Sequence, residues 1–321
     1  AVLFQNVDFN KEDLQFIVAG GAADLPDGYT ADKLVLLPTP TAEKTLRDSL
    51  EAGISVALTE DITLSTTVVI PANSNVTLDL GGKVCNTAAL NAGTTEQKSE
   101  YIKVGKGATL TIKNGTFTGR GIMNEGGKIV VEEGTVINAA DFSGGAAIRN
   151  KSGEIVINGG EFNSLNYVRW TADGYKGGAP VIYNETGKIT INGGTFISAT
   201  ETYMISQYGA GETIINGGTF KSVRGVVAVE NSGKVTINGG NFAVTADHVA
   251  EADRPAEYQG GHIVWTNSGG TVDIAAGEFS RTLSGGYVFC VSAGAINVSA
   301  GVKVNGNALE NALNLTDGQT H

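Results

Sequence analysis

Short runs of alternating apolar and polar residues follow one another along most of the chain. Runs such as TLTIKNG (109–115), KIVVEEG (128–134) and TVDIAAG (271–277) place every second side chain on one apolar face. This alternation predicts β-strands with one buried face. A second, shorter strand stands before each of them and ends in a polar turn, as in GIMNEGG (121–127) and VIYNETG (181–187).

The strands belong to a repeat. The nine residues KITINGGTF (188–196) return with small changes at 154–162, 212–220 and 234–242. Aligned on the last residue, the series is Phe117, Val136, Phe162, Phe196, Phe220, Phe242, Phe279 and Val302. The spacing runs from 19 residues (117 to 136) to 37 (242 to 279), so its floor lies near the ~20 residues of a solenoid coil and the excess comes as insertions.

Glycine and asparagine mark the turns of each unit. The Gly pairs, for example 193–194, permit the tight corner before the Phe position. Asn residues recur before the Gly pairs and again at the other turn, where stacked side-chain amides can hydrogen-bond to one another. The first set is Asn158, Asn192, Asn216 and Asn238, and the second is Asn124, Asn150, Asn184, Asn231 and Asn267.

These strand-NGG-Phe coils, together with ITLSTTVVIPANSNVTLDLGGK (62–83), resemble the right-handed parallel β-helix proteins. That group includes pectate lyase-like enzymes, phage tailspikes and many bacterial surface proteins. The resemblance covers about residues 54–304 and implies an all-β solenoid in which each coil pairs in parallel with its neighbours. It implies no particular activity, because one fold can host many functions.

The two ends of the chain lack the repeat. Residues 39–53 predict a short capping helix, with Thr41 as N-cap, Leu46 and Leu50 one turn apart and Gly53 as the stop. Residues 1–38 form a non-repeat segment that either packs along the solenoid flank or serves as an arm for a partner or larger assembly. Residues 305–321 are expected to form a C-terminal cap or a polar tail.

Charge and composition exclude several partners. The 33 acidic and 22 basic side chains give a net charge of -11, which disfavours nucleic acid and anionic membranes, and no apolar run is long enough for membrane insertion. Cys85 and Cys290 are expected to be free buried thiols. The start AVLFQNVDFNKEDLQF lacks the order of a signal peptide, which among extracellular, cell-surface and virion locations slightly favours a virion protein.

Two insertions carry the candidate binding residues. Both follow the same strand position of their coils, so they are expected to project from one side and to form two walls of a groove. Aromatic rings stack on the apolar faces of sugars, and Arg binds hydroxyl or charged substituents. The alternative is that Trp170 and Tyr175 only fold their loop onto the solenoid. The candidates are Tyr167, Arg169, Trp170, Asp173 and Tyr175 in the first insertion and Arg254, Tyr258, His262 and Trp265 in or after the second.

Acids in the second insertion are the candidates for catalysis. A glycosidase needs a pair of carboxylates a few ångströms apart, and Asp247, Glu251, Asp253 and Glu257 supply them, although such a run is also typical of solvated surface. The signatures of a polygalacturonase or a pectate lyase are absent from the sequence. With three His in the chain, a His-based metal site is disfavoured and no cofactor is expected; loose calcium binding by the acids stays open.

A row of unlike residues before the turn Asn argues against a regular lattice-matching face or a calcium-bound repeat: Met123, Arg149, Tyr183, Ser206, Glu230 and Thr266. Three functions remain. The first is a non-enzymatic surface or virion β-helix that presents a flank for a polysaccharide or receptor. The second is a polysaccharide-degrading lyase or hydrolase of the tailspike type. The third is a structural filament subunit, and in each case a homo-oligomer stays open.

Overall fold

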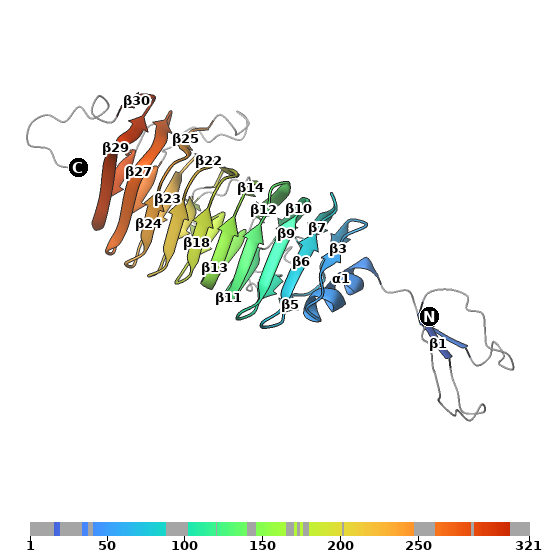
Figure 1. Cartoon of the computed structure of the whole chain (residues 1–321). Helices are drawn as coiled ribbons and strands as arrows, with labels where there is room; N and C mark the ends of the chain where they lie inside the picture. Colours follow the sequence, from blue (N-terminus) through green and yellow to red (C-terminus); the bar gives the residue numbers. More distant parts are fainter. Residues whose placement is uncertain are drawn as a thin grey trace, which may run out of the picture.

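The computed structural model describes residues 16–19, 34–37, 41–87, 102–119, 121–139, 146–164, 170–171, 174–175, 180–200, 202–246, 261–283 and 286–308. Within them, 26 strands form one continuous hydrogen-bonded sheet whose neighbours are almost all parallel. The strands stack coil upon coil along one axis, with the first ladder facing the viewer and the second along the upper edge (Figure 1). The predicted parallel β-helix is confirmed.

The described strands form three parallel ladders, and each coil contributes one strand to each ladder except the coil nearest the C-terminus, which contributes to the first two only. The first ladder contains β3 (Val56–Ala57), β6 (Asn75–Asp79), β9 (Thr109–Lys113), the second half of β11 (Ile122–Val131), the second half of β13 (Ile148–Ile157), β18 (Lys188–Ile191), β21 (Glu212–Ile215), β24 (Lys234–Ile237) and the first halves of β27 (Gly270–Arg281) and β29 (Gly294–Val304).

The second ladder begins with each Phe-bearing strand. It contains β4 (Ile62–Thr63), β7 (Val84–Asn86), β10 (Gly115–Gly119), β12 (Thr135–Ala139), β14 (Glu161–Ser164), β19 (Thr195–Ser198), β22 (Thr219–Ser222), β25 (Asn241–Val244) and the second halves of β27 and β29. The strand β30 (Asn307–Ala308) pairs antiparallel with the end of β29.

The third ladder completes the coil before the polar turn. It contains β5 (Val68–Ile70), β8 (Ile102–Val104), the first halves of β11 and β13, β17 (Ile182–Asn184), β20 (Tyr203–Gln207), β23 (Gly225–Val229), β26 (Val264–Thr266) and β28 (Phe289–Val291). Two further pairs of strands do not belong to the large sheet. β1 (Phe16–Ala19) pairs in parallel with β2 (Leu34–Leu37), and β15 (Trp170–Thr171) pairs antiparallel with β16 (Gly174–Tyr175).

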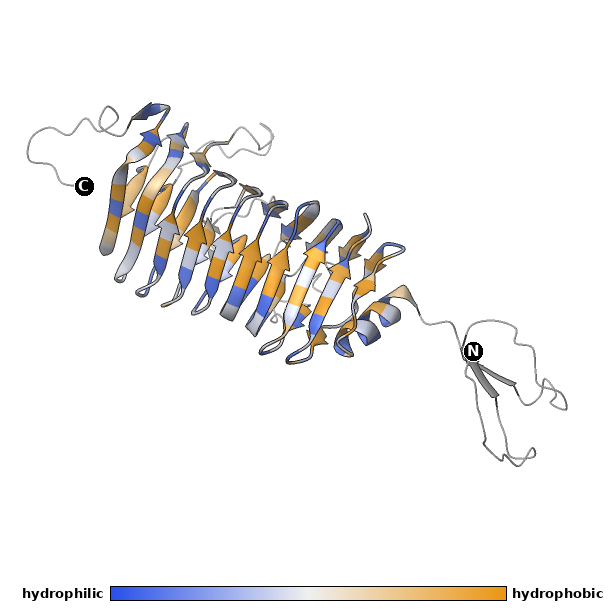
Figure 2. Ribbon diagram, viewed as in Figure 1, coloured by the Kyte–Doolittle hydropathy of each residue, from blue (hydrophilic) through white to orange (hydrophobic). Residues whose placement is uncertain are grey.

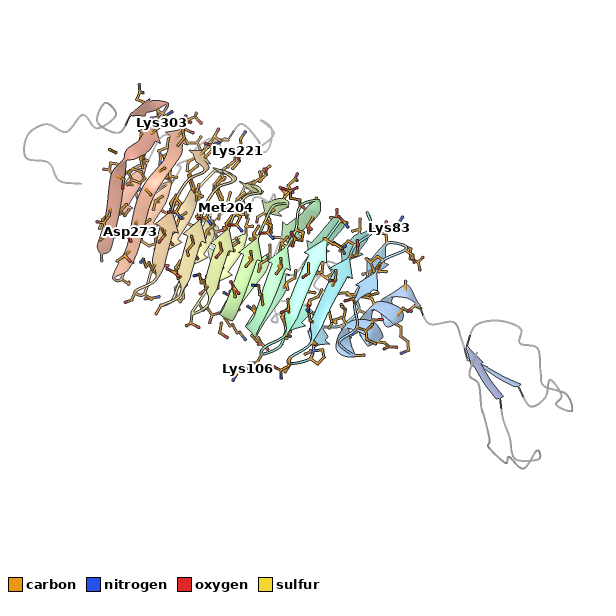
Figure 3. All side chains as sticks on the ribbon, in the orientation of Figure 1. Lys83, Lys106, Met204, Lys221, Asp273 and Lys303 are labelled. Atoms are coloured by element: carbon orange, nitrogen blue, oxygen red, sulfur yellow. The ribbon has the colours of Figure 1, made fainter. Side chains whose placement is uncertain are left out.

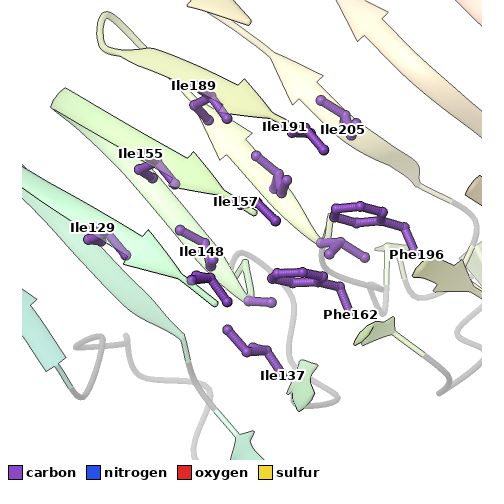
Figure 4. Close-up of a cluster of buried hydrophobic side chains, with 14 of the residues drawn as sticks. Ile129, Ile137, Ile148, Ile155, Ile157, Phe162, Ile189, Ile191, Phe196 and Ile205 are labelled. Atoms are coloured by element: carbon purple, nitrogen blue, oxygen red, sulfur yellow. The ribbon is translucent and has the colours of Figure 1, made fainter. Parts of the chain in front are cut away.

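The core is built of rows of like residues. Phe162, Phe196, Phe220, Phe242 and Phe279 stack face to face, with consecutive ring centroids 4.6 to 4.7 Å apart and interplanar angles of 6 to 15°. Rows of Ile lie beside them, for example Ile129, Ile155 and Ile189 (Figure 4). Because identical side chains repeat at the strand spacing, each coil continues the packing of the one before. Apolar residues alternate with polar ones along the strands (Figure 2).

The register corrects the repeat alignment at two coils. Ile137, not Val136, pairs with Phe117 and Phe162, and Val304, not Val302, pairs with Phe279. Ile137 is fully buried whereas Val136 is half-buried, because successive strand residues point to opposite faces and a slip of one residue exchanges inside for outside.

The predicted stacking of asparagines is confirmed for two sets. Asn192, Asn216 and Asn238 each donate from Nδ2 to Oδ1 of the Asn in the preceding coil, over 3.0, 2.9 and 2.8 Å, and this ladder is exposed. At the other turn the ladder is buried: Asn124 donates to Oδ1 of Asn150 over 3.0 Å. The prediction fails further on, because Gln207, Val229 and Thr266 occupy the register of Asn184, and Asn231 and Asn267 follow in the turns.

A capping helix covers the N-terminal end of the solenoid, as predicted. The helix α1 (Ala42–Glu51) begins after Thr41, whose side chain accepts a hydrogen bond from the backbone N–H of Lys44. Leu46 and Leu50 are buried against the first coil. Gly53 has φ +73°, the left-handed conformation that ends many helices.

Other expectations have mixed outcomes in the described part of the chain. Both cysteines are free. Burial raises the pKa of the Cys85 thiol to about 12, and nearby Glu43 adds to the shift, but Cys290 is only half-buried. None of the described helices has the length and apolar character that crossing a membrane requires. Of the C-terminal segment, β30 is described and residues 309–321 lie outside the described residues.

Candidate functional site

All the longer connections leave the solenoid at one corner, between the second and third ladders. The two large insertions run from β14 to β17 and from β25 to β26. The strands at their ends are in register, because Phe162, Phe196, Phe220 and Phe242 align on one side and Ile182, Ile205, Val227 and Val264 on the other. The prediction that both insertions start from the same side is therefore confirmed. We call this edge the insertion corner.

Most of the predicted site residues belong to the insertions themselves. Tyr167, Arg169, Asp173, Arg254 and Tyr258 lie outside the described residues. So do the candidate catalytic acids Asp247, Glu251, Asp253 and Glu257, and with them the predicted groove. Trp170 and Tyr175 are partners in the short antiparallel pair β15–β16. His262 and Trp265 are described in full, and both lie at the insertion corner.

Trp265 is part of a stacked aromatic pair that spans two coils. Its ring lies 5.7 Å from the ring of Tyr203, with an interplanar angle of 18°. Gly225, in the intervening strand β23, makes room for this contact, since a Cβ there would come within 2.4 Å of Cε1 of Tyr203. The indole Nε1 of Trp265 donates to Oγ of Ser292 over 2.8 Å. Both rings are half-buried, so each keeps an edge or face toward solvent.

His262 forms a second stacked pair at the same corner. Its ring is parallel to the ring of Tyr287, with centroids 5.6 Å apart and an interplanar angle of 1°, and Nδ1 accepts a hydrogen bond from the backbone N–H of Tyr287 over 2.9 Å. Partial burial lowers the pKa of His262, and the positive charges of Arg281 and Arg224 lower it further. The imidazole of His262 is therefore neutral near pH 7. Its stacking partner Tyr287 is 63% exposed, so this pair also faces solvent.

Two arginines complete the group. Arg281 donates to the carbonyl oxygens of Gly261, Tyr287 and Leu283 and so holds together the segments that carry His262 and Tyr287. Partial burial lowers the pKa of Arg281, although a guanidinium stays charged at any ordinary pH. Arg224 is exposed and lies against Gly261. We call Tyr203, Arg224, His262, Trp265, Arg281 and Tyr287 the corner cluster.

Burial also shifts the pKa of Tyr203 in the corner cluster. It raises the pKa of Tyr203 to about 12, against the effect of a hydrogen bond from the backbone of His262 and of the charge on Arg224. Tyr203 therefore keeps its proton at neutral pH and can donate a hydrogen bond. The corner cluster thus offers aromatic faces, neutral polar groups and fixed positive charge.

A second aromatic group lies on the third ladder. Arg149, Tyr183 and Tyr208 come from successive coils, with the guanidinium carbon of Arg149 5.3 Å from the ring centroid of Tyr183 and the rings of Tyr183 and Tyr208 5.7 Å apart. Arg149 also binds Oε1 of Glu185 through Nε at 2.9 Å and Nη2 at 2.8 Å. Burial raises the pKa of Tyr183 to about 12, and the nearby carboxylate of Glu185 raises it further. We call these three residues the tyrosine column.

The register changes the row before the turn Asn. Ala228 and Trp265, not Glu230 and Thr266, continue the row from Tyr183 and Ser206. The row is still mixed, so the argument against a lattice-matching face is unaffected. Elsewhere on the solenoid, Lys106 lies at the opposite edge from Lys83 and Lys221 (Figure 3).

Sequence reasoning missed four members of the corner cluster: Tyr203, Arg224, Arg281 and Tyr287. Each stands outside the two large insertions, in a strand or a short connection of a neighbouring coil. For Tyr203 the signal that could have found it is the register, because a correct alignment places Gly225 beside Tyr203, where the missing Cβ leaves room for the ring. No group of three or more His, Cys, Asp or Glu within the described ranges could hold a metal ion.

Comparison with known proteins adds no family. The chain matches no protein-family model, no curated protein and no solved structure.

Proposed function

We propose that this chain is a non-enzymatic β-helix of a cell surface or a virion, of the right-handed parallel type, that binds a polysaccharide through the corner cluster. The observation that carries the proposal is the stacked pair of Tyr203 and Trp265, which keeps solvent-facing aromatic surface at the corner where both large insertions begin. Burying these two rings in the core would give more stability than leaving them half-exposed, so their position favours a binding role.

The chemistry of the corner cluster suits a sugar. Aromatic faces cover the apolar face of a pyranose, and neutral His, phenol and guanidinium groups bind its hydroxyl or carboxylate substituents. Tyr, Trp and Arg are also the residues that most often dominate binding surfaces. The bonds from Arg281 to three carbonyl groups fix its side chain, so the ligand meets a preorganised surface.

Binding is favoured over catalysis. Glycoside hydrolysis needs two carboxyl groups at a fixed separation, and none of the six residues of the corner cluster carries a carboxyl group. The acids at 247–257 are the remaining candidates for such a pair. A depolymerase is therefore the alternative that the test must exclude. The proposed function also includes attachment of the chain to a larger assembly through residues 1–38.

The test incubates the purified chain with starch, xylan, mannan, polygalacturonate, alginate and hyaluronate and measures bound protein and new reducing or unsaturated ends together. We expect binding to at least one polysaccharide without new ends. Trp265→Ala should reduce that binding about tenfold or more. Ile214→Ala, which shortens a half-buried side chain on the outer face of the first ladder, should leave polysaccharide binding unchanged.

Three results would contradict the proposal. New chain ends that disappear when Asp247, Glu251, Asp253 or Glu257 is replaced by Ala would make the chain an enzyme. Binding that Trp265→Ala leaves intact would move the site elsewhere. The absence of any binding would leave the filament role, for which deletion of residues 1–38 should abolish assembly without unfolding the solenoid.

A further inference from the structure

We propose that the tyrosine column is a second subsite for the same polysaccharide, so that the ligand is a linear chain lying along the solenoid axis over the third ladder. This inference rests on the proposed function and adds to it the orientation and the minimum length of the ligand. It starts from one row of outward-facing residues. In register along the row stand Arg149, Tyr183, Ser206, Ala228 and Trp265.

The row has large residues at both ends and small ones between them. Tyr183 belongs to the tyrosine column and Trp265 to the corner cluster, whereas Ser206 and Ala228 are the two intervening residues. Ala228 is buried although it stands in the outward-facing row with Ser206 and Trp265. The two row positions between the aromatic groups therefore carry only short side chains, while Glu230 lies outside the row, next to Tyr208 in the following coil.

The distance between the groups follows from the strand spacing. Neighbouring strands lie about 4.8 Å apart, so the three steps from Tyr183 to Trp265 cover about 14 Å along the axis, and the two steps from the coil of the exposed Tyr208 cover about 10 Å. A pyranose unit in an extended chain advances by roughly one strand spacing. A saccharide of two units can reach one group only, and a chain of about three to four units or more reaches both.

The tyrosine column is built for contact with a ligand. Tyr208 is 46% exposed, and Tyr183 beneath it is held by the guanidinium of Arg149 on one side and by the ring of Tyr208 on the other. Arg149 is in turn fixed by its two contacts with Glu185. An exposed ring that is fixed from below loses little conformational entropy when a sugar stacks on it.

Two linked contacts predict a length dependence. Once the chain occupies the corner cluster, its continuation meets the tyrosine column at a high effective concentration, so the affinity rises steeply when the chain becomes long enough to touch both. Beyond that length the affinity should change little. A single site would instead give a plateau at one or two units.

The experiment measures the dissociation constants of size-fractionated oligosaccharides of starch, xylan, mannan, polygalacturonate, alginate and hyaluronate, from two to eight units, by calorimetry. The proteins are the full chain, Tyr208→Ala, Trp265→Ala, the double variant and the control Ile214→Ala. Tyr208→Phe keeps the ring and tests whether the aromatic face or the hydroxyl group matters. Thermal unfolding of each variant confirms that the solenoid is intact.

We expect Tyr208→Ala to weaken binding of six-unit chains about tenfold and to leave two-unit chains unchanged, with Tyr208→Phe close to the parent. Trp265→Ala should weaken both lengths. If Tyr208→Ala has no effect at any length while Trp265→Ala does, the second subsite is wrong and the proposed function stands. If no oligosaccharide binds and no polysaccharide is retained, both proposals fail.

Discussion

The ring of Tyr203 lies against Gly225 and reaches past it to stack on Trp265, two coils further along the solenoid. The missing side chain at Gly225 is what permits this contact. A Cβ at that position would lie 2.4 Å from Cε1 of Tyr203 and 2.4 Å from the carbonyl oxygen of His262. Gly225 thus lies against both the ring of Tyr203 and the backbone of His262.

Gly225→Ala should therefore separate Tyr203 from Trp265. We expect a loss of about 1–3 kcal/mol in the free energy of unfolding, because the new methyl group meets backbone as well as a ring, together with weaker polysaccharide binding. The emission of Trp265, recorded in a Trp170→Phe background, should shift as the stack opens. In the control Gly193→Ala the closest atom to the new Cβ is 3.4 Å away, and an unchanged spectrum is expected. Equal effects of the two substitutions would refute this role of Gly225.

The Phe stack predicts a difference between two buried phenylalanines. Phe220 has Phe196 and Phe242 as its stacked neighbours, whereas Phe117 pairs with Cys85 and Ile137. Both side chains are fully buried. Replacing either Phe by Leu changes the packing of the core. Phe220→Leu also loses two ring-stacking contacts, which are worth about 0.5–1.5 kcal/mol each. Phe220→Leu should lower the unfolding free energy in urea by about 1–3 kcal/mol more than Phe117→Leu; equal losses would show that the stacking adds nothing beyond burial.

The fold could be predicted because its determinants are local and repeated. Alternation gives the strands, the Gly pairs give the corners and the Phe series gives the coil, while Thr41, Leu46 and Leu50 identify the capping helix. Errors occurred where the coil loses its signature. At Ile137 and Val304 an aliphatic residue takes the place of Phe. Val136 and Val302 lie close by, so the sequence fits two alignments equally well.

The site could be predicted only in part, since it depends on register across coils. His262 and Trp265 adjoin an insertion and were found, but Tyr203 contributes to the corner cluster only because Gly225 and Ala228 leave space above the next strand. Arg281 similarly donates hydrogen bonds to carbonyl groups of other segments, among them that of Gly261, 20 residues earlier in the chain. No spacing within a single coil reveals such contacts.

The two asparagine ladders should differ in their contribution to stability. Asn150 is buried, accepts from Asn124 and donates to the carbonyl of Lys188 over 3.3 Å. Asn216 makes comparable bonds in the exposed ladder, where water can replace them. Asn150→Ala should cost about 1–3 kcal/mol in urea unfolding because it leaves buried groups without partners, and Asn216→Ala roughly 0.5 kcal/mol or less. A larger loss for Asn216→Ala would contradict the buried ladder as the stabilising one.

The lowered pKa of His262 predicts a dependence on pH. Its value in the folded protein lies below its ordinary value near 6.5, so the folded state favours the neutral ring. This contribution is complete above about pH 6.5 and is lost as the pH falls through the folded pKa, because protonation removes the acceptor for the N–H of Tyr287 and places a third positive charge beside Arg281 and Arg224.

His262→Asn tests that dependence, since the side-chain oxygen of Asn can accept the same N–H and does not titrate. Between about pH 8 and about pH 5 the melting temperature of the parent should fall further than that of His262→Asn, and binding of a neutral polysaccharide should weaken over the same range in the parent only. Other groups titrate equally in both proteins and cancel in the difference between them. Parallel curves for the two proteins would show that His262 is not the group that links the corner cluster to pH.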